Sequence, residues 1–132
     1  MSKNDPATFQ KIADGYMADG FFLKALALYK HILKLAPEML DVALRVAELH
    51  QQLGLTPEAL TSFHVVARLH EKAGDTRRLM ETLEKMVELD SGNVPLRLRL
   101  MGCYVREGLA DKAARELEKV AEHLSPEGSM KH

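Results

Sequence analysis

The stretch "FQKIADGYMADGFFLKALALY", from Phe9 to Tyr29, decides the fold because it holds two helical patterns with a break between them. Apolar residues recur every three or four positions as far as Tyr16, which is typical of one face of a helix. Gly20 then interrupts the pattern, as suits the left-handed residue that often follows a helix. From Ala25 onward the helical spacing resumes. The stretch therefore predicts two helices joined by a tight turn.

The same start and stop signals return along the whole chain. Glycines follow helical segments at positions 20, 54, 74 and 108, so the first and third intervals are equal and the middle one is shorter. Asp5-Pro6 and Thr56-Pro57 each offer an N-cap oxygen followed by a proline in the first turn, and Asp75 is placed to cap the segment after the third glycine. No sustained alternation of apolar and polar residues predicts a strand. We therefore expect an all-α chain.

Seven helices are expected from these signals, over about 6–19, 22–36, 38–53, 57–73, 75–89, 94–107 and 110–124. The fourth occupies the short interval between Gly54 and Gly74, where the longer spacing of the other glycines would leave room for one more helix. Nothing after Pro57 and before Gly74 breaks a helix, and its apolar residues spread around more than one stripe. We therefore expect this helix to serve two neighbouring repeats, with seven helices rather than eight.

Further positions agree when the chain is aligned on the glycines. The segments before the first two glycines read Phe9-x-x-Ile12-Ala13-x-x-Tyr16 and Ala43-x-x-Val46-Ala47-x-x-His50, and those after them read Ala25-x-x-x-Tyr29 and Ala59-x-x-x-Phe63. This pattern resembles the tetratricopeptide repeat, a helix-turn-helix unit of about 34 residues. The resemblance covers Pro6 to Leu124. It implies a right-handed α-solenoid with repeats at about 6–39, 40–73, 60–93 (overlapping) and 94–127.

Composition limits the possible partners. The 132 residues suit one domain, 1–132, in which we expect 125–132 to be a flexible tail whose "GSMKH" ending reads partly like an expression tag. Lys+Arg (18) and Asp+Glu (19) nearly cancel, which argues against nucleic acid and anionic membranes as partners. No apolar run is long enough to insert in a membrane. Cys103 is the single cysteine, so we expect no internal disulfide and a cytoplasmic location.

The residues do not form a recognisable catalytic or metal motif. His64 and His70 are six positions apart and lie on different faces of one helix, so we expect no metal and no cofactor. Ser62 and His64 do not share a helical face, and no basic residue near Cys103 in the sequence is expected to activate its thiol. We expect a protein that is not an enzyme, with a small enzyme using His64 or Cys103 as the remote alternative.

Several polar and apolar side chains are expected to have structural roles. His50 and His70 occupy the position of Tyr16 in their repeats and should pack between helices with one hydrogen bond each. Glu116 and Glu118 are expected to lie on a solvated helix face. The surplus apolar residues Phe21, Leu23 and Leu28 are expected to pack on neighbouring helices. If they do not, their apolar area would mark an interface.

The resemblance implies that the first helix of each repeat lines an inner groove. In this sequence the lining positions are Gln10, Asp14, Met17, Leu44, Glu48, Gln51, His64, Arg68, Leu98 and Val105. Members that grip a peptide's terminal carboxylate use lysines, asparagines and an arginine, whereas here those positions hold Gln10, Asp14, Arg45 and Glu48, so that clamp is absent.

The function implied is an adaptor or scaffold that binds a segment of a partner protein in the groove. A self-associating, homo-oligomeric structural module and a chaperone-like tetratricopeptide protein are the alternatives.

Overall fold

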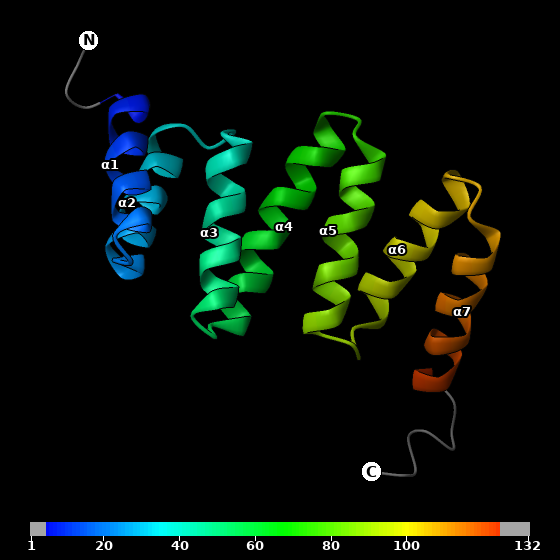
Figure 1. Ribbon diagram of the computed structural model, residues 1–132. Helices are drawn as coiled ribbons and strands as arrows, with labels where there is room; N and C mark the ends of the chain where they lie inside the picture. The colour runs from blue at the N-terminus through cyan, green and yellow to red at the C-terminus, as the bar shows by residue number, and fades with distance from the viewer. Residues whose placement is uncertain (1–4, 125–132) are drawn as a thin grey trace. The chain divides into compact units, whose positions relative to one another are not determined.

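The computed structural model describes residues 5–124, which form seven α-helices and no strand (Figure 1). The helices are α1 (Pro6–Ala18), α2 (Phe22–Leu35), α3 (Leu40–Gln52), α4 (Thr56–Lys72), α5 (Thr76–Leu89), α6 (Val94–Arg106) and α7 (Ala110–Leu124). The predicted all-α class and the seven helices are confirmed. The tail predicted at 125–132 lies outside the described residues.

The helix starts follow the capping signals with one exception. Asp5 Oδ1 accepts a hydrogen bond from the Thr8 amide at 2.7 Å, and Asp75 Oδ1 accepts one from the Arg78 amide at 3.1 Å. The N-cap role predicted for Thr56 is wrong by one position. Thr56 is already helical, and the carbonyl of Leu55 accepts the first helical hydrogen bond of α4.

A single helix fills the short interval between Gly54 and Gly74. This helix, α4, runs for 17 residues without interruption, and no second helix accompanies it among residues 55–73. α4 is this long because no glycine and no further proline lies between Pro57 and Gly74. The sharing of α4 between two repeats stays a prediction.

The four repeating glycines all adopt the left-handed backbone predicted for them, with φ between 73° and 80°. At Gly54, φ is +75° and a Cβ would meet no atom within 4 Å. The need for glycine there is therefore conformational rather than steric, because a left-handed φ strains an L-residue.

Replacing Gly54 with alanine should lower the free energy of unfolding by about 1 kcal/mol, because only the backbone strain changes. Gly15 provides a matched control, since it lies inside α1 and also has open space around its Cα. Gly15→Ala should raise stability by up to about 1 kcal/mol through helix propensity. Urea unfolding of the two variants tests this contrast, and equal shifts of the same sign would contradict the assigned conformations.

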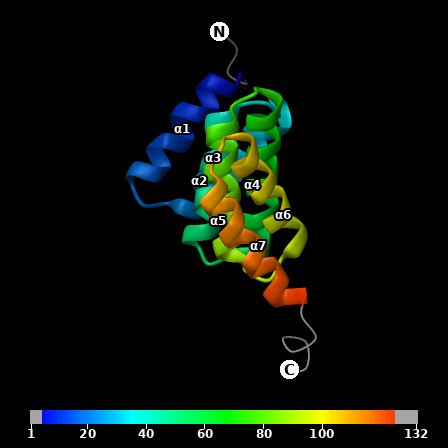
Figure 2. The same ribbon diagram turned by 90° about the vertical axis from the view of Figure 1, so that its right-hand side faces the viewer.

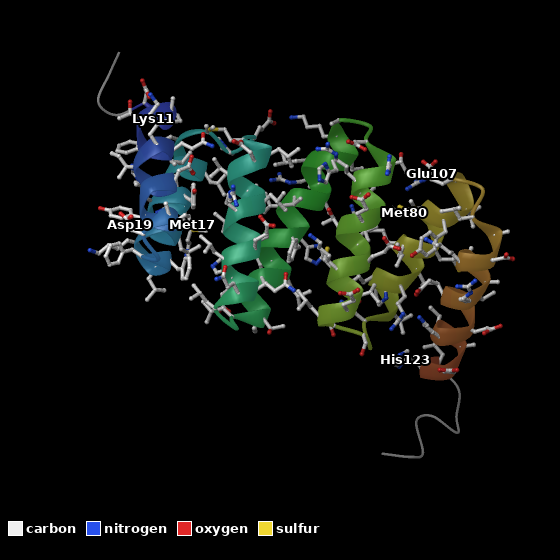
Figure 3. The ribbon with its side chains drawn as sticks, viewed as in Figure 1. Lys11, Met17, Asp19, Met80, Glu107 and His123 are labelled. Carbon is white, nitrogen blue, oxygen red and sulfur yellow. The ribbon has the colours of Figure 1, made fainter. Side chains whose placement is uncertain are left out.

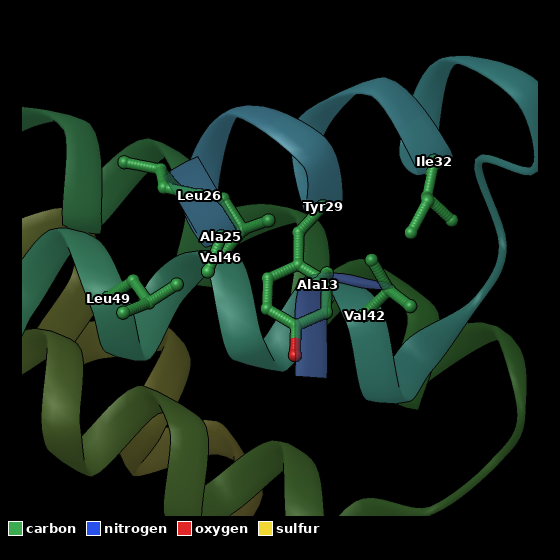
Figure 4. Packing of buried hydrophobic residues seen from close by; sticks show 8 residues of the cluster. All are labelled: Ala13, Ala25, Leu26, Tyr29, Ile32, Val42, Val46 and Leu49. Atoms are coloured by element: carbon green, nitrogen blue, oxygen red, sulfur yellow. The ribbon is translucent and has the colours of Figure 1, made fainter. Parts of the chain in front are cut away.

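The chain divides into two compact units, and the division falls within α4 after Leu69. Unit 1 holds α1, α2, α3 and most of α4, and its core gathers around Tyr29 of α2. Figure 4 shows the Tyr29 ring beside Ala13 of α1 and Val42 of α3. Ala13 and Ala25 are fully buried, as expected for small residues where helices approach closely.

Unit 2 begins at His70 and holds α5, α6 and α7, with α6 and α7 packed as a hairpin that is visible in both ribbon views (Figure 2). A buried ion pair joins the hairpin: Arg97 Nη1 lies 2.9 Å from Glu116 Oε2, and the two side chains are 7% and 9% exposed. Arg97 Nε also donates to the Ser91 carbonyl at 2.7 Å. The solvated position predicted for Glu116 is therefore wrong, because Arg97 balances its charge inside the hairpin.

No helix among residues 5–124 combines the length and the apolar character that crossing a membrane requires.

Candidate functional site

The predicted groove residues occupy one repeating register on α1, α3, α4 and α6. On α1 they are Gln10, Asp14 and Met17, and on α3 the residues one repeat later are Leu44, Glu48 and Gln51. We call the eight predicted positions of unit 1 the register face, and its remaining members are His64 and Arg68 on α4. Leu98 and Val105 hold the same register on α6. These two positions belong to unit 2.

Solvent reaches most of the register face. The charged and polar side chains of Glu48, Gln51 and Arg68 are exposed, and so is His64. Met17 is half-buried because it packs against the unit 1 core, and Figure 3 shows it on the side of α1 toward α3.

Leu44 is also half-buried. In unit 2, Leu98 is 43% exposed and Val105 is 64% exposed. The face thus combines partly embedded apolar residues with exposed polar groups.

Two members of the face also hold unit 1 together. Gln10 Nε2 donates a hydrogen bond to Asp41 Oδ2 on α3 at 2.7 Å. The Tyr29 hydroxyl on α2 donates to Asp14 Oδ1. Burial, together with this hydrogen bond, raises the pKa of Tyr29, so the hydroxyl remains a proton donor to Asp14. Gln10 and Asp14 therefore link α1 to α3 and to α2.

Sequence reasoning missed two positions that complete the register. Glu71 stands in α4 where Met17 stands in α1, and Gly102 stands in α6 where Asp14 does. Within unit 2, Arg99 Nη2 of α6 lies 2.6 Å from Glu71 Oε2, so Glu71 already has an ionic partner. Alignment of the third glycine with the first places Glu71 opposite Met17, and this was the signal that could have found it.

A second surface feature lies between α1 and α2. A shallow cavity of about 480 Å³ opens there, which we call the α1–α2 pocket. It is lined by Phe9, Ile12, Tyr16, Lys24, Ala27, Leu28 and His31. The rings of Phe9 and His31 meet edge to face with centroids 5.3 Å apart. The pocket is mainly apolar, with two basic side chains among its lining residues.

Of the surplus apolar residues Phe21, Leu23 and Leu28, one belongs to this pocket. Leu28 is half-buried and lines the pocket. Leu23 is 69% exposed, so the prediction that it packs on a neighbouring helix is wrong. Phe21 is 51% exposed, but its ring meets that of Tyr16 on α1 edge to face, with centroids 6.4 Å apart. Lys24 covers the Phe21 ring at 5.0 Å from its centroid, which shields part of this apolar area.

One serine and one histidine do meet, but their surroundings are structural. His50 Nδ1 lies 2.8 Å from Ser62 Oγ, a pairing between α3 and α4 that sequence reasoning missed because it tested Ser62 against His64. His50 is only 5% exposed, and burial lowers its pKa. The corresponding residues of the first repeat, Tyr16 and Leu28, are packing residues of α1 and α2. The pair therefore joins two helices through a partly buried hydrogen bond.

Two further candidates for chemistry, His70 and Cys103, are buried within unit 2. His70 is 6% exposed, its pKa is lowered by burial, and its Nδ1 has no hydrogen-bond partner, so the single bond predicted for that ring is not found at this nitrogen. Cys103 does have a basic neighbour, contrary to the prediction: Arg106 Nη2 donates to its sulfur at 3.2 Å. Within residues 5–124, no three side chains of metal-binding type gather in one place.

Comparison with known proteins gives structural matches only. No family model matches the chain, and no curated protein matches it. A solved structure of MamA from Desulfovibrio magneticus RS-1 has 21% sequence identity and a TM-score of 0.47, with 92% of this chain and 76% of that chain covered. YrrB, described as a TPR protein with an unusual peptide-binding site, has 18% identity and a TM-score of 0.46, with 93% and 71% covered.

A third match is TTC0263, described as a thermophilic TPR protein in Thermus thermophilus. Its identity is 18% and its TM-score 0.41, over 90% of this chain and 74% of that one. YrrB and TTC0263 are both described as TPR proteins, the family that the sequence pattern resembles.

Proposed function

We propose that the chain is a protein-interaction module that holds a segment of a partner protein on the register face. The observation that carries the proposal is the arrangement on α1 and α3. Met17 and Leu44 present partly exposed apolar side chains beside the exposed polar groups of Glu48 and Gln51. Apolar anchors surrounded by polar groups are the usual composition of a peptide-binding surface.

Binding on this face would involve burial and hydrogen bonding without a chemical step. Covering Met17 and Leu44 removes apolar area from water, which stabilises the complex by about 25 cal/mol per Å² before the costs of association. Glu48, Gln51 and Arg68 would then pair with backbone or side-chain groups of the bound segment and set its register. The partner is therefore a segment with apolar side chains at intervals, flanked by polar groups of both signs.

The face does not suit a partner's free carboxyl terminus. The positions that would supply lysine and asparagine in a carboxylate clamp hold Gln10 and Asp14, and both are already bonded within unit 1, to Asp41 and Tyr29. Asp14 and Glu48 add negative charge there, which repels a carboxylate. An internal segment of the partner is the better ligand.

The site is tested by making the apolar anchors charged. A peptide library displayed on phage is selected on the immobilised protein, and the best peptide is titrated by calorimetry. Met17→Glu and Leu44→Glu should each weaken its binding by about tenfold or more, because a buried unpaired charge is costly. Circular dichroism should show unchanged helicity.

Two further variants make this test decisive. Glu48→Arg changes an exposed member of the face without touching the core, and it should also shift the affinity. Leu23→Glu is the matched control, since Leu23 is 69% exposed and outside the face, and it should bind like the unaltered protein. Equal affinity for all four variants would show that the peptide binds elsewhere.

Self-association is the second candidate function, and the α1–α2 pocket favours it. The pocket is mainly apolar and separate from the register face, so it would hold a different ligand. The remote enzymatic alternative predicts a catalytic activity that His64→Ala or Cys103→Ala abolishes. Because His64 belongs to the register face, only Cys103→Ala, at a buried residue outside that face, is expected to leave peptide binding unchanged.

A further inference from the structure

One side of α7 carries an apolar stripe that nothing covers among residues 5–124. The stripe consists of Ala110, Ala114, Leu117, Ala121 and Leu124, all of them exposed. Leu117 is 54% exposed and Leu124 is 66% exposed. Successive residues of the stripe are alternately four and three positions apart. This is the spacing of residues along the side of a helix that packs on another helix.

The equivalent side of α2 shows what such a stripe contacts. Aligning Gly108 with Gly20 places Leu26 and Tyr29 of α2 at the positions of Ala114 and Leu117 in α7. In unit 1, Leu26 and Tyr29 are buried in a cluster that includes side chains of the following helix, α3. The corresponding side of α7 lacks such a helix among the described residues, so it remains open.

The α1–α2 pocket shows the complementary surface. Val46 of α3 belongs to the cluster with Leu26 and Tyr29 of α2 and is only 4% exposed. Ile12 of α1 is its equivalent, one repeat earlier, and it is 46% exposed at the edge of the pocket. The pocket side of α1 is therefore equivalent to the side of α3 that packs on α2. No helix among the described residues packs on it.

The charges beside the two surfaces are opposite in sign. Lys24, a cation, belongs to the lining of the pocket together with the imidazole ring of His31. On α7, Asp111 and Glu118 are exposed and lie next to the stripe, on the side away from the buried Glu116. An acidic edge beside an apolar stripe matches a basic edge beside an apolar pocket, and the pairing would also fix the orientation of the docked helix.

We propose that α7 of one copy of this chain docks in the α1–α2 pocket of a second copy. The contact joins two different surfaces, so each copy can accept one neighbour and offer α7 to another. It uses neither Met17 nor Leu44, and the register face therefore remains available for a partner segment. The inference rests on the second candidate function, self-association, for which it names the two contacting surfaces, and it does not depend on peptide binding by the register face.

Sedimentation equilibrium over a wide range of concentration, up to the millimolar, tests the contact. The average mass of the unaltered chain should rise above the monomer value of 14.8 kDa and should pass that of a dimer, because the contact can repeat. Ile12→Glu in the pocket and Leu117→Glu in the stripe should each lower the association constant by about tenfold or more. Leu23→Glu is the control and should associate like the unaltered chain.

Mixing the two variants distinguishes this contact from a symmetric one. Ile12→Glu retains an intact stripe and Leu117→Glu retains an intact pocket, so their mixture should form dimers and no larger species. Lys24→Glu provides a second pocket variant at an exposed side chain outside the core, and it should weaken association in the same direction.

A strict monomer at every concentration would overturn the proposal. So would association that Leu117→Glu leaves unchanged, or a mixture of the two variants that stays monomeric. The first of these results leaves peptide binding on the register face unaffected, so the two proposals fail independently.

Discussion

Replacing Arg97 with methionine should lower the free energy of unfolding by about 3 to 5 kcal/mol, the largest loss expected from a single side chain in unit 2. Arg97 and Glu116 are both buried and lie 2.9 Å apart, so the substitution leaves the Glu116 carboxylate buried without its main counter-charge. Lys119 is 3.8 Å from the same carboxylate but is about half exposed, and it replaces little of the lost interaction. The Ser91 carbonyl also loses its donor.

A double-mutant cycle followed by urea unfolding measures this effect. The double variant Arg97→Met/Glu116→Leu should be markedly more stable than Arg97→Met alone, because no buried charge remains. Arg77→Met is the matched control: Arg77 is 86% exposed in its pair with Glu81, and its loss should cost less than about 1 kcal/mol. A loss at Arg97 no larger than at Arg77 would contradict the buried pair.

Replacing Ala25 with tryptophan should destabilise unit 1 by about 3 kcal/mol or more, because the core has no room for the larger side chain. Ala25 is fully buried, and the small residue recurs at Ala59 and Ala113 in later repeats. The indole would have to displace neighbours in the cluster around Tyr29.

Thermal unfolding monitored by circular dichroism provides the measurement for Ala25→Trp. The control is Ala27→Trp, on the exposed side of the same helix, where the added ring has space. The control should melt close to the unaltered chain and Ala25→Trp far below it. Similar melting temperatures for the two variants would show that α2 does not pack as described.

The helices could be predicted because their signals are local. Glycine at the left-handed positions, aspartate before a helix start and apolar spacing of three and four residues act within one or two turns. They located all seven helices to within two residues at each end. The continuous α4 was predictable for the same reason, since nothing after Pro57 interrupts it. Thr56 failed as an N-cap because the helix begins at that residue, a shift too small for the pattern to resolve.

Side-chain partners could not be predicted because they depend on how distant residues meet. Glu116 looks like any acidic residue of an amphipathic helix until Arg97, 19 positions earlier, is packed beside it. Ser62 could be tested only against its sequence neighbour His64, while its partner His50 lies on the preceding helix. The exposure of Phe21 likewise depends on which helix covers α2.

The repeat pattern was enough to predict which positions of the candidate site correspond between helices. It was not enough to predict the hydrogen bonds that those residues make. The repeat placed Met17, Leu44 and Gln51 on corresponding sides of their helices, and the spacing alone was enough. That Gln10 and Asp14 serve as links to Asp41 and Tyr29 follows from packing, which the sequence does not display. The binding role of the register face stays a proposal.

Backbone amide chemical shifts, recorded while the selected peptide is titrated into the ¹⁵N-labelled chain, test the central proposal most directly. The account predicts that the largest changes fall on α1 and α3 around Met17, Leu44 and Gln51. Changes confined to the α1–α2 pocket and α7, with the register face unmoved, would contradict it.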